Sequence, residues 1–170
     1  MGDIAIDDLS LSTSPCTTVD ALCTFDKDTC GYTDDKSSSM QFQWTRASKA
    51  TSSHNTGPTN DHTQQSSSGF YMYTEASSQK VGDKARIISP VYSKKSARCL
   101  NFWYHMFGQT MGTLRVFLKV NGALQIKPIW AESGNKGDVW RIGRATMKSP
   151  YTDYQVSLIT SYENCLIIET

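Results

Sequence analysis

The chain has 170 residues, enough for one domain, and its charges nearly cancel, with 17 Lys and Arg against 16 Asp and Glu. This balance, without any block of like charges, excludes the strong field that would attract nucleic acid or an anionic membrane. No apolar run reaches the roughly 18 residues needed to span a bilayer, so we expect no direct membrane insertion of this chain. Hydrophobic residues make up 38% of the chain, which is enough for a real core.

The opening stretch GDIAIDDLSLSTSPC (2–16) reads as a strand followed by a stop. Its apolar residues Ile4, Ile6, Leu9 and Leu11 are separated by Asp and Ser, and it ends at Ser-Pro-Cys. It carries Asp3, Asp7 and Asp8, and it has neither a basic n-region nor an apolar h-region. We therefore predict no signal peptide in it.

The rest of the chain predicts short strands joined by turns. Residues 32–69 are rich in polar residues and read as loops, with short strands at 42–46 and 69–73. Further strands are predicted at 85–88, 99–108, 112–122, 126–130, 139–147 and 154–160. We count about ten short strands and little helix, so the fold class is all-β, an antiparallel β-sandwich.

Two of these segments show clear patterns. The stretch CLNFWYHMFG (99–108) alternates, with Cys99, Asn101, Trp103, His105 and Phe107 on one face and Leu100, Phe102, Tyr104 and Met106 on the other. The stretch 112–122 also alternates and ends in Asn121-Gly122, a hairpin-turn signal. The returning strand contains Pro128, which indicates a sheet edge.

The sequence offers no catalytic motif of a familiar kind. It lacks a G-x-S-x-G elbow, an H-E-x-x-H motif and a phosphate-binding glycine loop, and GNKGD (134–138) is interpreted as a turn between strands. His54 and His62 lie in polar loops, where we expect solvated side chains. His105 lies in an aromatic strand, where we expect a ring at the edge of the core with a satisfied nitrogen. We predict that the chain is not an enzyme.

The five cysteines contain no CxxC pair, and none has zinc-finger spacing with a histidine. Cys23 and Cys30 are separated by six residues, which suits a small disulfide loop across a turn. The odd count leaves one cysteine unpaired or paired outside the chain.

One group of residues, a set of Asp carboxylates, could bind a cation. Asp26 and Asp28 lie in CTFDKDTC, Asp61 lies in a polar loop, and Asp3, Asp7 and Asp8 lie in the opening stretch. Hard cations such as Ca²⁺ take oxygen ligands from loops. The same residues are also typical of ordinary solvated turns, so spacing alone leaves both interpretations open.

Several blocks occur in the order seen in MAM domains. They are CTFDKDTCGYT (23–33), FQWTR (42–46), TGPTNDHT (56–63), GFYMYTEAS (69–77), GDKARIISP (82–90), CLNFWYHMFGQTMGTLRVFL (99–118) and WAESGNKGDVWRIGRATM (130–147). The chain therefore resembles the MAM domain family, named for meprins, a neuropilin-type receptor and receptor tyrosine phosphatase mu. The resemblance covers roughly residues 23–160.

The resemblance implies a jelly-roll, concanavalin-like sandwich with a non-catalytic role in adhesion. It implies one disulfide within the first block, Cys23–Cys30, and a second from Cys99 to a cysteine near the end of the domain. It also implies a cation near the first block, which supports Asp26, with Asp28, Asp61 and Asp7 as further candidates. A structural Ca²⁺ or Na⁺ is the one cofactor this suggests, and none is required for a contact role.

The order of the blocks departs from the family in one respect. A MAM domain ends in a stretch like the one that opens this chain, whereas this chain ends in SYENCLIIET (161–170). One interpretation divides the chain into the end of a preceding repeat (1–16), a linker (17–22), a MAM domain (23–160) and a divergent tail (161–170). The other is self-complementation, in which the opening strand fills the place of the missing last strand. Cys99 then pairs with Cys16, whereas in the rival arrangement it pairs with Cys165.

We therefore expect an extracellular or cell-surface module, cut from a larger multidomain protein with tandem MAM repeats, that binds a protein partner. The sequence leaves open whether that partner is a second copy of the chain or a different protein. The alternative is a jelly-roll carbohydrate-binding module. That function needs an exposed aromatic platform, for which Tyr71, Tyr73 and Trp130 are the candidates, although all three stand at strand positions that favour burial. The sequence singles out no ligand-contact residue.

Overall fold

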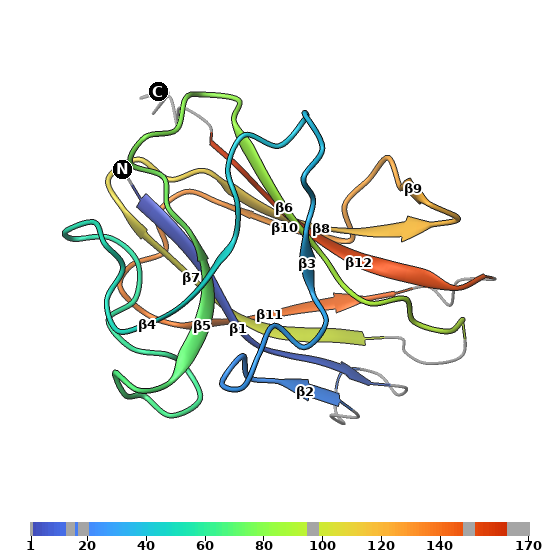
Figure 1. Cartoon of the computed structure of the whole chain (residues 1–170), viewed down its shortest axis with the longest axis horizontal. Coiled ribbons are helices and arrows are strands. Elements are labelled where there is room, and N and C mark those ends of the chain that lie inside the picture. Colours follow the sequence, from blue (N-terminus) through green and yellow to red (C-terminus); the bar gives the residue numbers. More distant parts are fainter. Residues whose placement is uncertain (1, 13–15, 17–20, 95–98, 148–151, 163–170) are drawn as a thin grey trace, which may run out of the picture.

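The computed structural model describes residues 2–12, 16, 21–94, 99–147 and 152–162. These residues form twelve strands in two antiparallel sheets that pack face to face (Figure 1). The predicted antiparallel β-sandwich is confirmed, and the two layers are consistent with a jelly roll. In this part of the chain, no helix has the length and hydrophobicity that crossing a membrane requires.

Each sheet contains six strands. The first has the order β11-β7-β1-β5-β4, with β2 beside β1, and the second has the order β10-β8-β12-β6-β3, with β9 beside β8. The strands of the first sheet are β1 (Gly2–Ser12), β2 (Ala21–Cys23), β4 (Thr45–Ser48), β5 (Phe70–Thr74), β7 (Cys99–Gly108) and β11 (Arg141–Thr146). Those of the second are β3 (Thr33–Asp34), β6 (Lys84–Ile88), β8 (Thr113–Val120), β9 (Ala123–Leu124), β10 (Trp130–Ser133) and β12 (Tyr154–Ser161).

The opening strand β1 lies inside the first sheet and not at its edge (Figure 1). One side of β1 pairs with β7 from Gly2 to Ser12, and the other side pairs with β5 and β2. Its backbone groups are therefore bonded on both sides, and it covers edges of β5 and β7 that would otherwise be open to other chains. This is the position that self-complementation assigns to the opening strand.

A β-bulge explains the irregular apolar spacing of β1. The register with β7 shifts between Asp7 and Ser10, so that Asp8 and Leu9 together lie opposite Phe102. Asp8 has a φ of 51°, a left-handed conformation that Asp adopts more readily than most residues. The extra residue returns the alternation to phase and keeps one apolar face pointing inward on both sides of the bulge. The core side chains of that face are Ile4, Ile6, Leu9 and Leu11.

The core lies between the facing sides of the two sheets. From β7 it receives one of the two faces that the alternation predicts, Leu100, Phe102, Tyr104 and Met106. β8 and β12 contribute Leu114, Val116, Leu118, Val156 and Leu158 from the opposite sheet. Trp130 packs edge-on against Phe102 and Tyr104, with ring centroids 4.9 and 5.1 Å apart. Burial of each such side chain contributes roughly 1.5–3 kcal/mol, so the apolar faces hold the two layers together.

Two predicted strands are displaced. The strand expected at 42–46 begins only at Thr45, and Phe42 packs on the core from a loop. The returning strand expected at 126–130 is replaced by β9, which pairs with β8 directly after the turn, and by β10, which starts at Trp130. Pro128 between them lacks the amide hydrogen that a sheet ladder needs.

The Asn121-Gly122 turn is confirmed, because both residues have positive φ, 51° and 78°, as the tightest hairpins require. Other predictions fall beyond the described residues. They concern positions 17–20 of the predicted linker, positions 163–170 of the predicted tail and Cys165.

Replacing Ile6 by Ala tests whether β1 is part of the core. Ile6 is fully buried, so we expect Ile6→Ala to lower the free energy of unfolding by about 2–5 kcal/mol, measured by urea denaturation. Ile126→Ala is the matched control, because Ile126 is 97% exposed, and it should change stability by less than about 0.5 kcal/mol. Equal effects of the two substitutions would contradict the placement of β1.

Candidate interaction site

Acidic residues of β1 hold the long loop between β4 and β5 against the outer face of the first sheet. The carboxylate of Asp3 accepts hydrogen bonds from the Thr56 hydroxyl at 2.8 Å and from the Ala76 amide at 3.2 Å. Burial raises the pKa of Asp3 and the charge of Glu75 adds to this, while the hydrogen bonds oppose it. The start of β1 thus fixes both the middle of the loop and the segment after β5.

The bulge residues Asp7 and Asp8 bind the next part of the same loop. Asp7 accepts a hydrogen bond from the backbone amide of His62 at 2.9 Å. The carboxylate of Asp8 lies 2.5 Å from Nδ1 of His62 and accepts the Thr63 hydroxyl at 2.5 Å. Burial raises the pKa of Asp7 to about 8, and the charges of Asp8 and Asp61 contribute. Two consecutive carboxylates therefore fix the backbone and the ring of one histidine.

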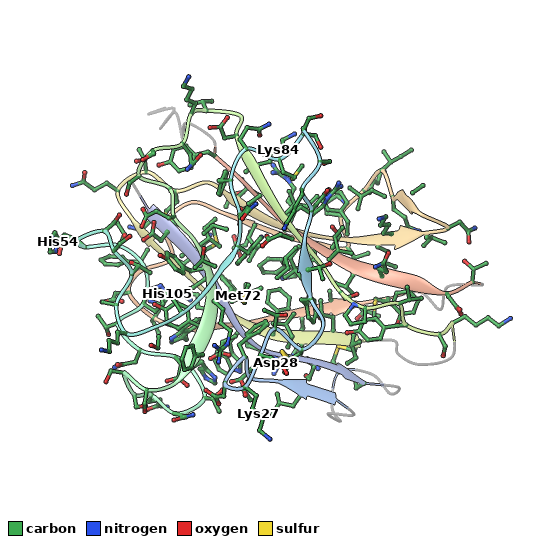
Figure 2. The ribbon with its side chains drawn as sticks, in the orientation of Figure 1. Lys27, Asp28, His54, Met72, Lys84 and His105 are labelled. Carbon is green, nitrogen blue, oxygen red and sulfur yellow. A yellow bond between two sulfur atoms is a disulfide. The ribbon has the colours of Figure 1, made fainter. Side chains whose placement is uncertain are left out.

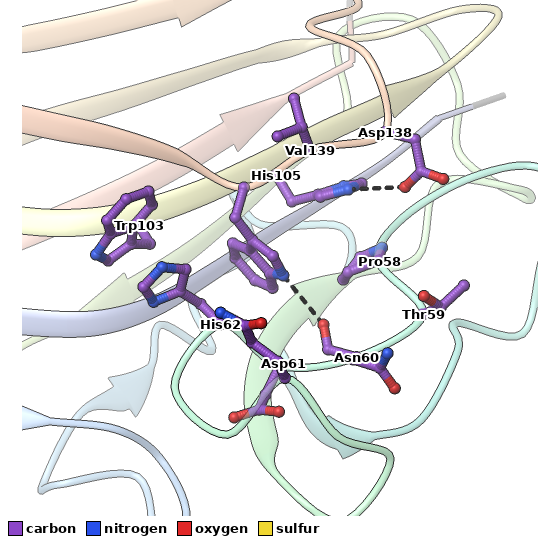
Figure 3. Close-up of a pocket in the computed structure, with 11 residues that line it drawn as sticks. Pro58, Thr59, Asn60, Asp61, His62, Trp103, His105, Asp138 and Val139 are labelled. Atoms are coloured by element: carbon purple, nitrogen blue, oxygen red, sulfur yellow. Dashed lines mark hydrogen bonds and ion pairs between the residues drawn. The ribbon is translucent and has the colours of Figure 1, made fainter.

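His62, held in this way, joins an aromatic cluster on the outer face. Its ring stacks on Trp103 of β7 with centroids 3.7 Å apart (Figure 3). Trp140 approaches the His62 ring edge-on, with centroids 6.2 Å apart. Trp140 also contacts His105 at 5.4 Å and donates a hydrogen bond from Nε1 to the carbonyl oxygen of Asn60 at 3.0 Å. The aromatic cluster, defined as His62, Trp103, His105 and Trp140, therefore joins the β4–β5 loop to the segment before β11.

His105 projects from β7 into this cluster and is 2% exposed. Its Nε2 lies 3.1 Å from Oδ1 of Asp138, whose side chain is 56% exposed (Figure 3). Burial lowers the pKa of His105, although the charge and hydrogen bond of Asp138 oppose this. A neutral ring that donates from Nε2 fits the site, because the buried Nδ1 has no hydrogen-bond partner among the described residues. The predicted satisfied ring nitrogen is Nε2.

The aromatic cluster lines a hollow of about 430 Å³ on the outer face. A second hollow of about 420 Å³ adjoins it, and His62 and Trp103 line both. We call the two hollows together the outer groove; their size is typical of binding sites for small molecules or single side chains. The first hollow is completed by Pro58, Thr59, Asn60, Asp61, Gln65, Asp138 and Val139, and the second by residues that include Leu22, Asn101, Ile142 and Arg144.

Asp28 and Asp26 of the predicted cation site have different surroundings. Asp28 is exposed and accepts the Cys30 amide at 2.6 Å, which completes the disulfide turn. Asp26 accepts the Phe70 amide at 3.1 Å. Partial burial opposes ionisation of Asp26, but hydrogen bonds from Gln64 and Phe70 outweigh it and lower its pKa. Asp26 therefore connects the first block to the end of the β4–β5 loop.

Asp61 organises the end of that loop. It is 1% exposed, and its two oxygens accept the amides of Gln64 at 2.6 Å and Ser66 at 3.0 Å. Gly69 packs against the carboxyl group so closely that an added Cβ would lie 2.1 Å from the carboxyl carbon. Position 69 therefore requires glycine, and the loop folds around a buried carboxylate.

The four predicted cation ligands do not form one site in the described residues. A hard cation takes six to eight oxygen ligands, whereas no group of three or more Asp, Glu, His or Cys side chains in the described ranges is arranged to hold a metal ion. Asp7, Asp26, Asp28 and Asp61 instead accept hydrogen bonds from backbone amides. The Ca²⁺ or Na⁺ that the resemblance implies at these residues therefore stays a prediction.

Two disulfides brace the same sheet. Cys23–Cys30 closes the first block, with Cα atoms 6.0 Å apart. Cys16–Cys99 joins the end of the opening stretch to the start of β7, with Cα atoms 5.2 Å apart and a sequence separation of 83 residues. A loop of that length restricts the unfolded chain enough to contribute about 4.5 kcal/mol. Both predicted pairs are present, and the rival partner Cys165 lies outside the described residues.

The geometry corrects the expectation for His62 and confirms the burial that the strand position of Tyr71 favours. The polar loop predicts a solvated His62, but the Asp8 contact and the Trp103 stack hold it, whereas His54 is exposed as predicted (Figure 2). Tyr71 cannot form a platform because it is fully buried, and its hydroxyl donates to the carbonyl oxygen of Lys49. Tyr73 and Trp130 are half-buried, the latter against the core. The sequence analysis did not identify the groove, and the one signal that could have indicated it is the pair of aromatic side chains, Trp103 and His105, on one face of β7.

Comparison with known proteins gives consistent matches. The profile of the family described as "MAM domain, meprin/A5/mu" matches residues 23–164. MAM domain-containing glycosylphosphatidylinositol anchor protein 2 of Mus musculus is 39% identical over 146 residues, covering 77% of this chain and 15% of that protein. MAM domain-containing protein 2 of Homo sapiens is 34% identical over 146 residues, covering 82% of this chain and 21% of its own length. Neuropilin-1 of Xenopus laevis is 37% identical over 132 residues, covering 76% of this chain and 13% of its own length. The chain thus spans about a fifth or less of these relatives.

The buried Asp7 carboxylate should make stability depend on pH. Its pKa is raised from 3.8 to about 8, so its contribution to stability is fully present below the pKa of the unfolded chain and is lost as pH rises through the folded pKa. We expect the free energy of unfolding to fall between about pH 5 and pH 8, with a slope of up to about 1.4 kcal/mol per pH unit from this group. Asp7→Asn should remove that slope in urea titrations.

Asp153→Asn is the control, because Asp153 is exposed just before β12 in the other sheet, and it should retain the slope. An Asp7→Asn variant with the same pH dependence as the parent chain would contradict the account. The titrations repeated with millimolar Ca²⁺ also test the predicted cation, which would flatten the slope of the parent chain by neutralising the Asp7 carboxylate.

Proposed function

Because the chain belongs to the MAM domain family, we propose that it is a non-catalytic extracellular module that mediates protein–protein contact or oligomerisation within a larger cell-surface or secreted protein. Its relatives include a MAM domain-containing glycosylphosphatidylinositol anchor protein and neuropilin-1. The chain covers only a small part of each relative, so a role in a larger protein is part of what we propose. The two disulfides support an oxidising, extracellular location.

The proposal rests mainly on the exposed apolar side chains that line the outer groove. Leu22 of β2 is 60% exposed, Val139 is 48% exposed and Ile142 of β11 is 39% exposed. All three line the groove that contains Trp103. Exposed apolar side chains gathered around aromatic residues and rimmed by polar groups are typical of surfaces that bind another protein.

An association assay with beads tests the proposal. Fluorescent beads coated with the chain are mixed with uncoated beads, with beads of a second colour carrying the chain, and with cells. We expect the coated beads to associate with one another if contact is homophilic, or with cells if it is heterophilic. Because tryptophan-containing apolar centres contribute most to such contacts, Ile142→Glu and Leu22→Glu should reduce association about tenfold or more.

Ile126→Glu is the matched control, since Ile126 is exposed in the loop between β9 and β10, outside the groove. It should leave association unchanged. Association that responds equally to all three substitutions would reject the groove as the contact surface. Absence of association with either beads or cells would reject the contact function.

A further inference from the structure

The hollow at the Asp138 end of the outer groove is acidic. Asp61 and Asp138 line it, and no Lys or Arg is among its described lining residues. Asp61 is already bonded to two backbone amides, but Asp138 is 56% exposed and uses one oxygen for His105. Its second oxygen has room for a further donor. A positively charged group that enters this hollow would therefore meet a carboxylate that can accept its hydrogen bonds.

The rings of the same hollow also favour a cation. Trp103 and Trp140 line it, and the faces of tryptophan rings attract positive charge more strongly than those of other aromatic side chains. His105 does not compete for Asp138 as a cation, because burial lowers its pKa. The half-buried His62–Asp8 contact and the bond from Trp140 to Asn60 hold the rings in place before a ligand arrives. The hollow is thus rigid, aromatic and negatively charged.

The rim of the hollow suits the rest of a long side chain. Val139 and Pro58 line it beside the charged groups (Figure 3), and the methylene stem of an arginine packs well on such apolar surface. A planar guanidinium stacks on indole rings and donates to a carboxylate with several N–H groups, which a lysine ammonium cannot match. The neighbouring hollow with Leu22 and Ile142 offers apolar contact for the adjoining residues of the partner.

We propose that the hollow lined by Asp138, Trp103 and Trp140 binds an arginine side chain presented by the protein partner. This inference rests on the proposed contact function and names the chemistry by which the outer groove recognises that partner. Arginine is the anchor residue, and the apolar groove beside it binds the residues that flank the arginine.

The test uses small probes and the intact chain. N-acetylarginine amide is titrated into ¹⁵N-labelled chain, and the indole N–H resonances of Trp103 and Trp140 are followed by NMR. N-acetylcitrulline amide, which has the same shape without the charge, is the matched ligand. We expect saturable chemical-shift changes of both indole N–H resonances with the arginine probe. The citrulline probe should bind at least about fivefold more weakly, because the charge-assisted hydrogen bonds are lost.

Two substitutions of the protein sharpen the test. Asp138→Asn should weaken the arginine probe about fivefold or more, while its amide oxygen still accepts the bond from Nε2 of His105. Asp153→Asn removes the same charge from an exposed site before β12 and should bind as the parent chain does. Thermal midpoints of the two variants establish that both remain folded.

Three results would overturn the inference: no indole shift at tens of millimolar arginine probe, equal binding of citrulline, or unchanged binding by folded Asp138→Asn. Neutral oligosaccharides are titrated in parallel. Indole shifts with a sugar and none with arginine would make the hollow a glycan site and would also overturn the inference.

The bead assay separates this inference from the proposed function. Association that depends on Ile142 without arginine binding leaves the contact function standing and rejects the arginine site. Arginine binding without any bead or cell association would leave the arginine site standing and reject the contact function. Loss of bead-to-bead association in Asp138→Asn would identify a second copy of the chain as the partner that supplies the arginine.

Discussion

The pairing of β1 with β7 on one side and with β5 and β2 on the other is the interaction on which the rest of the structure depends. A strand in this position closes the middle of a six-stranded sheet and contributes one apolar face to the core. Without it, β5 and β7 would each have an unpaired edge, and Phe102 and Met106 would lose the core side chains that β1 supplies. Unpaired strand edges promote aggregation. The Cys16–Cys99 disulfide adds a covalent link at the end of the same pairing, so that the strand is held by backbone bonds, burial and a cross-link.

The same strand also connects the fold to the site. Its bulge is needed because the apolar residues before and after Asp7-Asp8 would otherwise point to opposite faces. As a result two adjacent carboxylates bind His62, one through its amide and one through its ring. The stack on Trp103 and the walls of the outer groove follow from that anchor. The bulge that restores the alternation of β1 therefore also positions the surface for which we propose a contact role.

The faces of β7 and the Asn121-Gly122 turn could be predicted from the sequence, because both depend on residues close together along the chain. The resemblance to MAM domains supplied the order of the blocks and the two candidate partners of Cys99. The role of His62 could not be predicted, because Asp8 is 54 residues away and polar loops are usually solvated. The groove was missed for the same reason, since its aromatic residues come from β7 and from the segment before β11. The replacement of one returning strand by β9 and β10 depends on pairing after a tight turn, which hydrophobic spacing alone does not determine.

Disulfide mapping of the non-reduced monomeric chain tests most directly whether β1 completes its own sandwich. The chain has no Lys or Arg between Met1 and Lys27, so trypsin leaves Cys16 and Cys23 on one peptide, and a second cleavage before Asp20 separates them. The account predicts a peptide in which Cys16 is joined to Cys99 and another in which Cys23 is joined to Cys30. A monomer in which Cys99 is joined to Cys165, with Cys16 free, would contradict it.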